Sequence, residues 1–535
     1  MGYYFNSTRP FSLYESETKK PYFIDKSDML RKLIPLVEEG NNHVCITRPR
    51  RFGKSIMAAM VGAFFGKGVD SSSIFEVLKI SGENDYRQHM NQHNVIYMNF
   101  IKPANQSSSY EEFIQQIEKF LIRDLRKSFP DVDYWRGLSS ADFLGMIHEE
   151  TGEIFIFVLD EWDCIFHKSF ITDEDRKYFI NWLATMTKDT GYVSLSYMTG
   201  VLPIAKYSSG STINNFKEYS MPTDTLYSDY FGFTDAEVDE LYSRYETRTE
   251  PPRITREDLR YWYDGYHTLS SKRIYNPRSV VEALDRNSIQ SYWTRTGPYS
   301  EISTYVVNDI DDVKKDVALM VAGEAVKASV EEFAATSMNL NTRNEILSAM
   351  VVYGFLDYEK GKVRIPNKEL MDEFEKTIRE REGLGYIHRL AIESERMLRA
   401  TLQCDTNTVE EILQFAHDTE TPLLDYNDEA ELTAIVNLVY LAARDSYYVE
   451  REDKAGRGYV DFIFYPEKQG QDGIILELKV DDTPEAAIRQ IKNRNYVMKF
   501  QGKMAEKKRH TGRILMVGIG YGRKKKEHRC KIEVL

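Results

Sequence analysis

Four apolar runs, separated by helical stretches, constrain the fold of this chain more than any other feature. They are HVCITRP (43–49), NVIYMNF (94–100), EIFIFVLDE (153–161) and YVSLSYMTG (192–200). Runs of this length and continuity are typical of strands buried on both faces of a parallel sheet. The intervening stretches, such as 55–65 and 110–128, have helical character. The first 220 residues therefore predict an α/β layer in which crossover helices connect parallel strands.

The rest of the chain predicts two further parts. Residues 221–345 are helical and polar, and a helix over 345–353 followed by two short strands around Lys360-Gly361 predicts a winged-helix-like module. From about residue 400 the pattern is a smaller α/β unit. Its expected elements are helices over 408–417, 428–444 and 484–500, two short strands between the last two helices, and a final strand over 513–518. The expected domains are 1–220, 221–395 and 396–535.

Composition limits the class of protein. At 535 residues the chain is too long for one core, and 42% hydrophobic residues is too many for a disordered chain. The chain contains no run of 18 apolar residues, so the sequence predicts no membrane span. Its first ten residues, MGYYFNSTRP, lack both the basic segment and the apolar stretch of a signal peptide. The four cysteines form no C-x-x-C pair, which excludes a cysteine-built zinc knuckle. We therefore expect a reduced, cytoplasmic protein.

Charge is distributed unevenly along the chain. The net charge of −13 argues against a protein coated with DNA-binding surface. Residues 501–535, however, hold eleven Lys and Arg against three Glu, a net charge of +8. Such a basic C-terminal segment fits either a surface that faces nucleic-acid phosphates or a solvated end of the chain.

A phosphate-binding loop is predicted between the first strand and its helix. A P-loop needs backbone N–H groups that face phosphates, a Lys for the β- and γ-phosphates, and a Ser or Thr hydroxyl for Mg²⁺. Gly53, Lys54 and Ser55 match the end of this motif, but Arg48 replaces its first glycine. A bare Gly-Lys followed by Ser or Thr arises by chance in roughly one chain in four of this length, and it also fits an ordinary helix start. The expected nucleotide-binding residues of the loop are Arg50, Arg51, Phe52, Gly53, Lys54 and Ser55.

A second strand strengthens the case for a nucleotide site. The run 154–159 leads directly into Asp160 and Glu161, which is the Walker B arrangement. Asp160 is expected to hold Mg²⁺ with Ser55, and Glu161 to activate the attacking water. Thr199, at the end of the fourth strand, is the candidate for sensing the γ-phosphate. The alternative is that these strands simply end in polar turns.

The C-terminal part contains a candidate nuclease site. Glu477 and Lys479 are two residues apart on one strand, so both side chains project from the same face. If this strand pairs with the preceding one, Asp461 lies beside them. Two carboxylates suit Mg²⁺ or Mn²⁺, and the lysine can position a water against a phosphate. Gln490 and Tyr496, on the helix that follows, can reach the same face, and the alternative is the charged edge of a hairpin.

A further acidic ligand is left open. Glu450 and Glu452 precede the first of these strands, and Glu431 lies on the preceding helix. Their spacing singles out none of them.

Taken together, the chain resembles a bacterial family in which an AAA-like ATPase domain precedes a PD-(D/E)XK nuclease domain with a restriction-endonuclease-like fold. The matching segments are spread over most of the chain: 22–26, 48–55, 159–163, 199–204, 230–234, 262–266, 274–277, 456–461, 477–479 and Gln490. The family shares Arg48 at the position of the first P-loop glycine. The resemblance implies ATP and Mg²⁺ as cofactors and DNA as the partner, and it places Asp25 and Lys26 near the base.

The expected function is therefore an ATP-binding, ATP-regulated, metal-dependent nuclease that hydrolyses DNA phosphodiester bonds, in defence against foreign DNA or in mobile-element biology. The catalytic residues would be Asp461, Glu477, Lys479 and Gln490, with Asp461 and Glu477 as metal ligands. The alternative is a DNA-binding or signalling ATPase whose nuclease fold is inactive. The arginines of the loop could also face a neighbouring subunit of a homo-oligomer.

Overall fold

A computed structural model gives the structure of the chain, which is described for residues 2–204, 213–270, 272–293, 311–330, 340, 342–384, 386–417, 429–450, 461–494, 496–506 and 511–535. The chain forms two compact units. The first comprises Met1–Gly297, Ala328–Gly361 and Pro366–Glu369, and the second Pro298–Lys327, Lys362–Ile365 and Leu370–Leu535. The three-part division expected from the sequence, with boundaries near residues 220 and 395, stays a prediction.

The first unit is built on a parallel sheet with the strand order β2-β3-β4-β1-β5. The strands are β1 (Asn42–Thr47), β2 (Asn94–Asn99), β3 (Phe155–Asp160), β4 (Val193–Gly200) and β5 (Lys217–Ser220). The first four are the four apolar runs, nearly all of whose residues are buried, so the expected parallel α/β layer is confirmed. The fifth strand was not expected, because it is short, polar and lies at the sheet edge.

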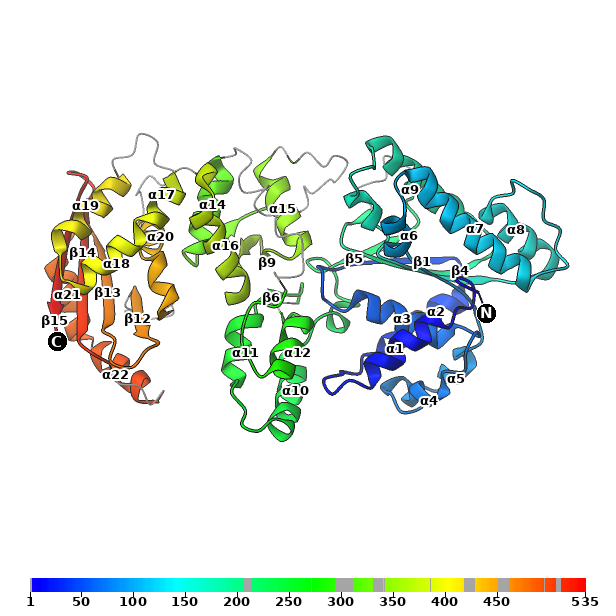
Figure 1. Cartoon of the computed structure of the whole chain (residues 1–535), viewed down its shortest axis with the longest axis horizontal. Coiled ribbons are helices and arrows are strands. Elements are labelled where there is room, and N and C mark those ends of the chain that lie inside the picture. Colours follow the sequence, from blue (N-terminus) through cyan, green and yellow to red (C-terminus); the bar gives the residue numbers. More distant parts are fainter. Residues whose placement is uncertain are drawn as a thin grey trace. The chain divides into compact units, whose positions relative to one another are not determined.

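Helices cover both faces of this sheet (Figure 1). One face carries α1 (Arg9–Thr18), α2 (Leu30–Glu39), α3 (Lys54–Phe65), α4 (Ser72–Phe75) and α5 (Tyr86–His89). The other carries α6 (Ile101–Gln106), α7 (Tyr110–Ser128), α8 (Ser140–Thr151) and α9 (Asp173–Thr187). Local chemistry sets the helix ends. At the start of α9, for example, Thr172 and Asp175 form a capping box that satisfies two backbone N–H groups.

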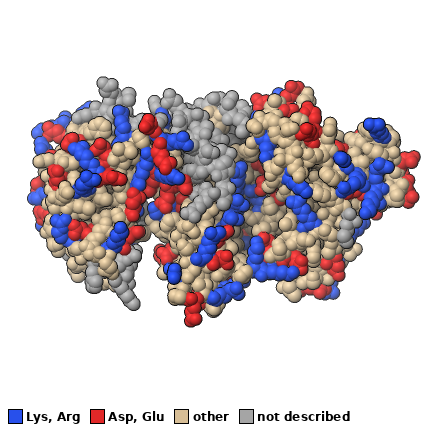
Figure 2. Space-filling view, viewed as in Figure 1, with Lys and Arg blue, Asp and Glu red and all other residues tan. Residues whose placement is uncertain are grey.

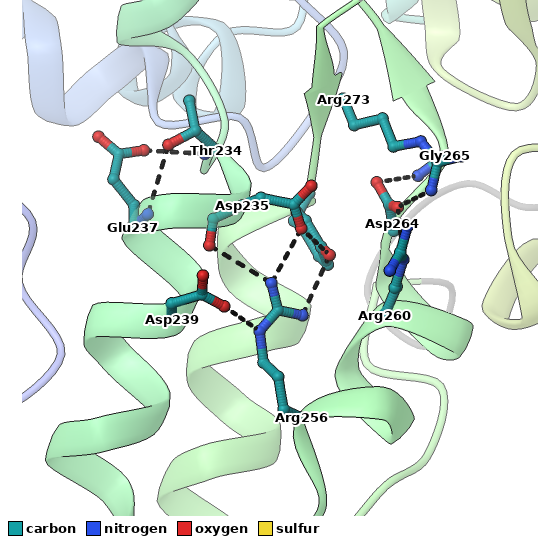
Figure 3. A network of polar contacts seen from close by, with 10 residues as sticks. Thr234, Asp235, Glu237, Asp239, Arg256, Arg260, Asp264, Gly265 and Arg273 are labelled. Atoms are coloured by element: carbon teal, nitrogen blue, oxygen red, sulfur yellow. Dashed lines mark hydrogen bonds and ion pairs between the residues drawn. The ribbon is translucent and has the colours of Figure 1, made fainter.

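The remainder of the first unit is mostly helical. It contains α10 (Asp235–Arg248), α11 (Arg256–Tyr263), β6 (Tyr266–His267), β7 (Arg273–Ile274), α12 (Pro277–Arg286), α15 (Arg343–Tyr353) and β9 (Asp357–Glu359). Arg256 ties these helices together (Figure 3). Its guanidinium donates to Asp239 at 2.6 Å and to Asp235 at 2.9 Å, both on α10. It also donates to the Tyr275 hydroxyl at 3.1 Å, just before α12, so one side chain fixes three segments.

The second unit contains a mixed sheet with the order β11-β12-β13-β14-β15. The strands are β11 (Tyr447–Glu450), β12 (Phe462–Pro466), β13 (Gly473–Val480), β14 (Ile514–Gly522) and β15 (Glu527–Val534). Only β13 and β14 are parallel; the other neighbouring pairs are antiparallel. The parallel pair is possible because α21 (Pro484–Asn493) and α22 (Tyr496–Glu506) form the crossover between its strands.

The helix α16 (Lys368–Glu380) begins in the first unit and continues in the second. The other elements of the second unit are α14 (Asp311–Val321), β8 (Val326–Lys327), β10 (Lys362–Arg364), α17 (Tyr386–Ile392), α18 (Ser394–Leu402), α19 (Thr406–His417) and α20 (Glu429–Val439). The helical middle and the small C-terminal α/β unit are thus confirmed, and a helix and two short strands (α15, β9 and β10) follow one another where a winged-helix-like module was expected. The single helix expected over 484–500 is instead two, because the backbone leaves the helical conformation at Arg494. Among the described residues, no helix is long and apolar enough to cross a membrane.

Candidate functional site

The loop before α3 has the backbone of a phosphate-binding turn. Arg51 and Gly53 have φ angles of 73° and 89°, in the left-handed region that glycine adopts without strain. This turn leads into α3, whose first residue, Lys54, is buried. The Lys54 ammonium donates to the carbonyl oxygens of Arg48 at 3.0 Å and Pro49 at 3.1 Å. The lysine therefore lies folded over its own loop, where an anion would meet it.

Arg48, which replaces the first glycine of the motif, points away from the loop. Its guanidinium is fully buried and forms an ion pair with Asp224. It also donates to the carbonyl oxygens of Thr47 at 2.8 Å and Tyr219 at 2.7 Å, and it lies over the ring of Phe231. Arg48 thus anchors the edge strand β5 and the chain after it.

Asp160, at the end of β3, gathers polar side chains from the two neighbouring strands and a helix. The sheet register places Asn99, Asp160 and Thr199 in one row across β2, β3 and β4. Asp160 Oδ1 accepts from the Thr199 hydroxyl at 2.7 Å and from the Ser55 hydroxyl at 3.2 Å, and Oδ2 accepts from Asn99 at 2.6 Å. Burial, and the nearby charge of Glu161, raise the pKa of Asp160. Ser55 and Asp160, the expected Mg²⁺ ligands, are therefore adjacent, and Thr199 contacts Asp160.

Asp163 makes the segments after β3 and β4 rigid with respect to each other. Its buried Oδ2 accepts from the backbone N–H groups of Val201 at 3.0 Å and Leu202 at 2.7 Å. A Cβ at Gly200 would lie 2.4 Å from the indole nitrogen of Trp162, so only glycine fits there. These contacts hold the segments 159–163 and 199–204 together.

A cavity of about 390 Å³ opens beside the loop, within the first unit. Lys54 and Ser55 line one part of it. Tyr22, Phe23 and Phe233 also line it, so cationic, polar and aromatic side chains share one cavity. A nucleotide likewise combines charged phosphates with a flat base.

Of Asp25 and Lys26, the two residues expected near the base, Lys26 lines the cavity and Asp25 does not. Lys26 lines the cavity and is buried; its ammonium donates to the Asp229 carbonyl at 2.6 Å and contacts Glu237 at 2.7 Å. Burial lowers the pKa of Lys26. The Asp25 carboxylate instead accepts from the backbone N–H of Lys79 at 2.6 Å and does not line the cavity.

Of the other loop residues, the Phe52 ring is buried and packs edge-on against Tyr266 at 5.1 Å, so only its backbone can face a ligand. Arg50 is half-buried and lies outside the cavity wall, whereas Arg51 and Glu161 line it. The structure therefore brings Arg51, Lys54, Ser55 and Glu161 to one cavity.

Two polar residues of this site were missed by the sequence analysis. Asn99 is one; its only signal was a polar residue at the end of an apolar run. The other is Arg278, which lines the cavity near the start of α12, where Asn276 caps the helix. Its Nη2 lies 3.3 Å from Glu282, and its buried Nε has no hydrogen-bond partner among the described residues. Repulsion from Arg278 contributes, after burial, to the lowered pKa of Arg51. Two arginines that line one cavity and repel each other favour an anion beside them.

The predicted nuclease residues are also brought together. Phe462 is the register partner of Leu476, so Asp461, just before β12, falls opposite Glu477 on β13. Asp461 Oδ2 accepts from the backbone N–H of Leu478 at 2.6 Å. The two carboxylates come from neighbouring antiparallel strands, as the sequence analysis expected.

Glu477 is the centre of this cluster. Its residue is only 1% exposed, and its Oε1 accepts from the Lys479 ammonium at 2.8 Å and from the Gln490 amide. Burial, together with the charge of Asp461, raises the pKa of Glu477 to about 7. The pKa of Tyr496 is raised by burial and by the charge of Glu477, so Tyr496 lies in the same cluster.

The donor set of this cluster fits a hard divalent cation. The second oxygen of Glu477, Oε2, is buried and has no hydrogen-bond partner among the described residues. Because an unpaired buried carboxylate oxygen is costly, a cation beside Asp461 and Glu477 would satisfy it. In the described part of the chain, no group of three or more His, Cys, Asp or Glu side chains is arranged to hold a metal ion.

Of the three candidates for a third acid, the structure describes the side chain of Glu450 alone. Glu450 binds Lys503 at 2.6 Å. The side chain of Glu431, and all of Glu452, lie outside the described residues.

Two glycines on β14 keep the cluster compact. Gly518 and Gly520 are the register partners of Glu477 and Lys479. A Cβ at Gly518 would lie 2.4 Å from the carbonyl oxygen of Pro484, and one at Gly520 would lie 3.1 Å from the Pro484 ring. The start of α21 can therefore lie close over the sheet beside the two functional residues.

Acids neutralise much of the basic C-terminal segment. In the second unit, Lys and Arg lie among Asp and Glu on the face shown in Figure 2. Five of the eleven cations form ion pairs: Lys503–Glu450, Arg513–Asp472, Arg523–Asp481, Arg529–Glu527 and Lys531–Glu533. Lys507, Lys508 and Arg509 lie outside the described residues. The sequence count of +8 therefore overstates the charge that is free to meet a partner.

Comparisons with protein families agree with these two sites. Residues 12–209 match the family described as "Predicted AAA-ATPase", and residues 428–523 match the PD-(D/E)XK nuclease superfamily. The chain pairs an ATPase-like domain with a nuclease-like domain. The resemblance that the sequence motifs indicated is thereby confirmed. Lys54, Ser55 and Asp160 lie within the first matched segment and Asp461, Glu477 and Lys479 within the second, whereas Phe233 and Arg278 of the cavity lie beyond residue 209.

Individual relatives are more distant. The chain is 24% identical over 284 residues to an uncharacterized protein encoded in the vnfD 5' region of Azotobacter chroococcum mcd 1, and it spans about half the length of that relative (52% of this chain, 51% of the relative). Among solved structures it is similar to a Walker-type ATPase, PABY2304, of Pyrococcus abyssi (13% identity, 65% and 95% of the two chains, TM-score 0.35). It is also similar to the ORC2 protein of Aeropyrum pernix in ADPNP–ADP complexes (13% identity, 66% and 93%, TM-score 0.32). Scores this low carry no argument about the nuclease-like or the ATPase-like domain.

Proposed function

We propose that the protein is an ATP-regulated, metal-dependent nuclease that hydrolyses DNA phosphodiester bonds. One observation supports this most strongly: Glu477 is buried, its Oε2 has no hydrogen-bond partner among the described residues, and it lies beside Asp461 in contact with Lys479 and Gln490. A nuclease fold that only bound a partner would not need this costly arrangement. Mg²⁺ or Mn²⁺ would be held by Asp461 and Glu477.

In this proposal each residue has a distinct task. A bound divalent cation would supply Lewis acidity and lower the pKa of its water. Lys479, whose ammonium reaches Glu477 Oε1 at 2.8 Å, would hold the attacking water and offset charge on the phosphate. Gln490 would orient the Glu477 carboxylate by donating to the same oxygen.

A plasmid-nicking assay with Mg²⁺, with Mn²⁺ and with a chelator tests the nuclease. Asp461→Asn and Lys479→Met should each lower metal-dependent nicking at least 100-fold. Glu467→Gln, which removes an exposed carboxylate just after β12, should leave nicking unchanged. Nicking that persists without metal, or in both active-site variants, would assign the activity to another site or to a contaminant.

We infer that ATP·Mg²⁺ occupies the cavity of the ATPase-like domain. Lys54 would exchange its loop carbonyls for phosphate oxygens, and Ser55 and Asp160 would hold the metal. Arg51 and Arg278 would contact the terminal phosphates, Glu161 would activate water, and Thr199 would sense the γ-phosphate through Asp160. The aromatic side chains that line the cavity would take the base. Isothermal titration should show that Lys54→Ala abolishes ATP binding, whereas Lys119→Ala, an exposed lysine on α7, does not.

The residues of the cavity wall support the proposed regulation by ATP. Gly232, Phe233 and Arg278 line the cavity together with the P-loop, so a nucleotide would contact the helical part of the first unit as well as the sheet. Ser279, next to Arg278, donates to the buried Glu369 carboxylate at 2.7 Å in the first turn of α16. Nucleotide exchange is therefore expected to change the middle of the chain, which would control the nuclease.

The competing function is a DNA-binding or signalling ATPase with an inactive nuclease fold. Mass in solution and DNA cleavage, each measured with ADP and with a slowly hydrolysed ATP analogue, distinguish the two. A change in either with the analogue supports the switch, and a change in mass would reveal a homo-oligomer. If neither changes, the regulatory part of the proposal fails. If DNA is bound but neither DNA nor RNA is cut under any condition, the competing function holds.

A further inference from the structure

The tip of the β14–β15 hairpin carries the unpaired positive charge of the basic segment. The tip is the four-residue turn Arg523-Lys524-Lys525-Lys526. All four residues are exposed, and Arg523 is paired with Asp481. Lys524, Lys525 and Lys526 have no ion pair with any described residue, in contrast to the five paired cations of the same segment. Three adjacent lysines that form no ion pair with the described residues repel one another, so a polyanion would stabilise them.

The tip is held in place by the body of the domain. Its backbone closes through the Lys526 N–H, which donates to the Gly522 carbonyl at 2.8 Å. The Gln414 amide on α19 donates to the Lys526 carbonyl at 3.1 Å and accepts from the backbone N–H of His528 at 3.4 Å. Arg523 donates to Asp481 at 2.7 Å and so ties the other side of the tip to the end of β13. The lysines therefore extend from a fixed backbone, which reduces the entropy lost on binding.

The sheet register places this tip close to the proposed nuclease site. Lys479 on β13 is the partner of Gly520 on β14, and the two strands are parallel. Gly522, where the hairpin turn begins, is only two residues further along β14, roughly 7 Å at about 3.3 Å per residue. Adjacent strands lie about 4.8 Å apart, so the turn begins roughly 8 Å from Lys479. Two or three nucleotides of a DNA strand, at about 3.4 Å per nucleotide, span this distance.

We propose that Lys524, Lys525 and Lys526 form a backbone clamp that holds duplex DNA two or three nucleotides from the phosphate presented to Asp461, Glu477 and Lys479. This inference rests on the proposed nuclease function and assigns DNA binding to one part of the basic segment. The clamp lies just beyond residue 523, where the match to the nuclease superfamily ends. It contacts phosphates only, so binding is independent of base sequence.

Salt-dependent binding tests the clamp without relying on cleavage. Anisotropy of a labelled DNA duplex is titrated with the full chain between 50 and 200 mM KCl, with EDTA present so that no cleavage occurs. Each phosphate contact contributes about 0.9 to the slope of log Kobs against log[salt]. The triple variant K524Q/K525Q/K526Q should therefore make this negative slope shallower by about 2 to 3.

A matched control removes the same charge elsewhere on the second unit. Lys376, Arg399 and Lys468 are exposed, and none lies on the hairpin. If K376Q/R399Q/K468Q keeps the wild-type slope while the tip variant loses 2 to 3, the clamp is supported. An unchanged slope in the tip variant, an equal loss in the control, or tip-dependent binding of RNA but not of DNA would each overturn it. If the tip variant keeps the wild-type slope and the wild-type chain still nicks plasmid DNA, the clamp fails and the nuclease proposal stands. A wild-type chain that does not bind DNA would overturn both.

Discussion

Lys479 donates to one oxygen of Glu477 at 2.8 Å, while the other oxygen of that buried carboxylate has no partner among the described residues. The lysine therefore compensates only part of the charge that burial makes costly. Because this compensation is incomplete, the pKa of Glu477 is raised to about 7. Several measurable consequences depend on this pair and on its counterpart in the ATPase-like domain, Asp160.

Metal-dependent cleavage should increase with pH through about pH 7. Glu477 must lose its proton to bind a cation, and its pKa is raised to about 7. At subsaturating Mg²⁺ the rate should rise roughly tenfold per pH unit below pH 7 and level off above it. Nicking rates measured between pH 5.5 and 8.5 check this. A profile that is flat over that range would mean that Glu477 is not the titrating ligand.

Glu477→Gln should stabilise the metal-free protein at alkaline pH. A carboxyl whose pKa is raised in the folded state contributes stability below its unfolded pKa, and this contribution is lost as the pH rises through about 7. The neutral amide avoids that loss, so the variant should be about 1 to 3 kcal/mol more stable than wild type at pH 8. Near pH 4.5 the difference should vanish. Melting temperatures in EDTA at the two pH values provide the test, with Glu467→Gln as the exposed control; equal melting temperatures at pH 8 would contradict it.

Removing one partner of the Arg48–Asp224 pair should strongly destabilise the ATPase-like domain. Both side chains are fully buried, so Arg48→Ala leaves an uncompensated carboxylate inside the protein. The expected loss is about 3 to 5 kcal/mol in the free energy of unfolding. Arg50→Ala, two residues away and half-buried, should change it by less than about 0.5 kcal/mol. Urea unfolding measures both, and similar values for the two variants would show that Arg48 does not anchor the domain.

Asn99→Ala should weaken the proposed Mg²⁺·ATP site without removing a ligand. Asn99 donates to Asp160 Oδ2 at 2.6 Å and so orients the carboxylate toward Ser55. Loss of such a supporting contact lowers metal affinity or activity about 10- to 100-fold. The Mg²⁺ concentration needed for half-maximal ATP binding should rise by this factor, while ADP binding without Mg²⁺ stays unchanged. An equal loss in both measurements would mean that Asn99 only supports the fold.

The sequence predicted the parts of the fold in which each strand carries its own signal. The first four strands of the parallel sheet are long apolar runs, and the carboxyl ends of such strands share one edge, so Ser55, Asp160 and Thr199 were expected at one place. The alternation around Glu477 and Lys479 likewise fixed which side chains share a face. These signals are local and need no knowledge of the neighbours.

The remainder depends on contacts distant in sequence. The strand β5 is polar and edge-paired, so its register with β1 gives it order that its own residues do not indicate. Arg278 lines the cavity only because α12 packs beside the P-loop, more than 200 residues away in the chain. The basic segment was read as one charged region, whereas acids such as Asp472 neutralise most of its described cations through the fold. Charge pairing of this kind cannot be counted from composition.

Gly518 and Gly520, the bare positions opposite the two functional residues of β13, have a consequence for how such chains are compared. A single added methyl group at either position would press against the start of α21 and displace the segment that covers the carboxylate cluster. Every residue that is expected to act in cleavage would still be present. For relatives of this protein, an intact motif and an intact site are therefore separate properties, and it is the glycines that would tell them apart.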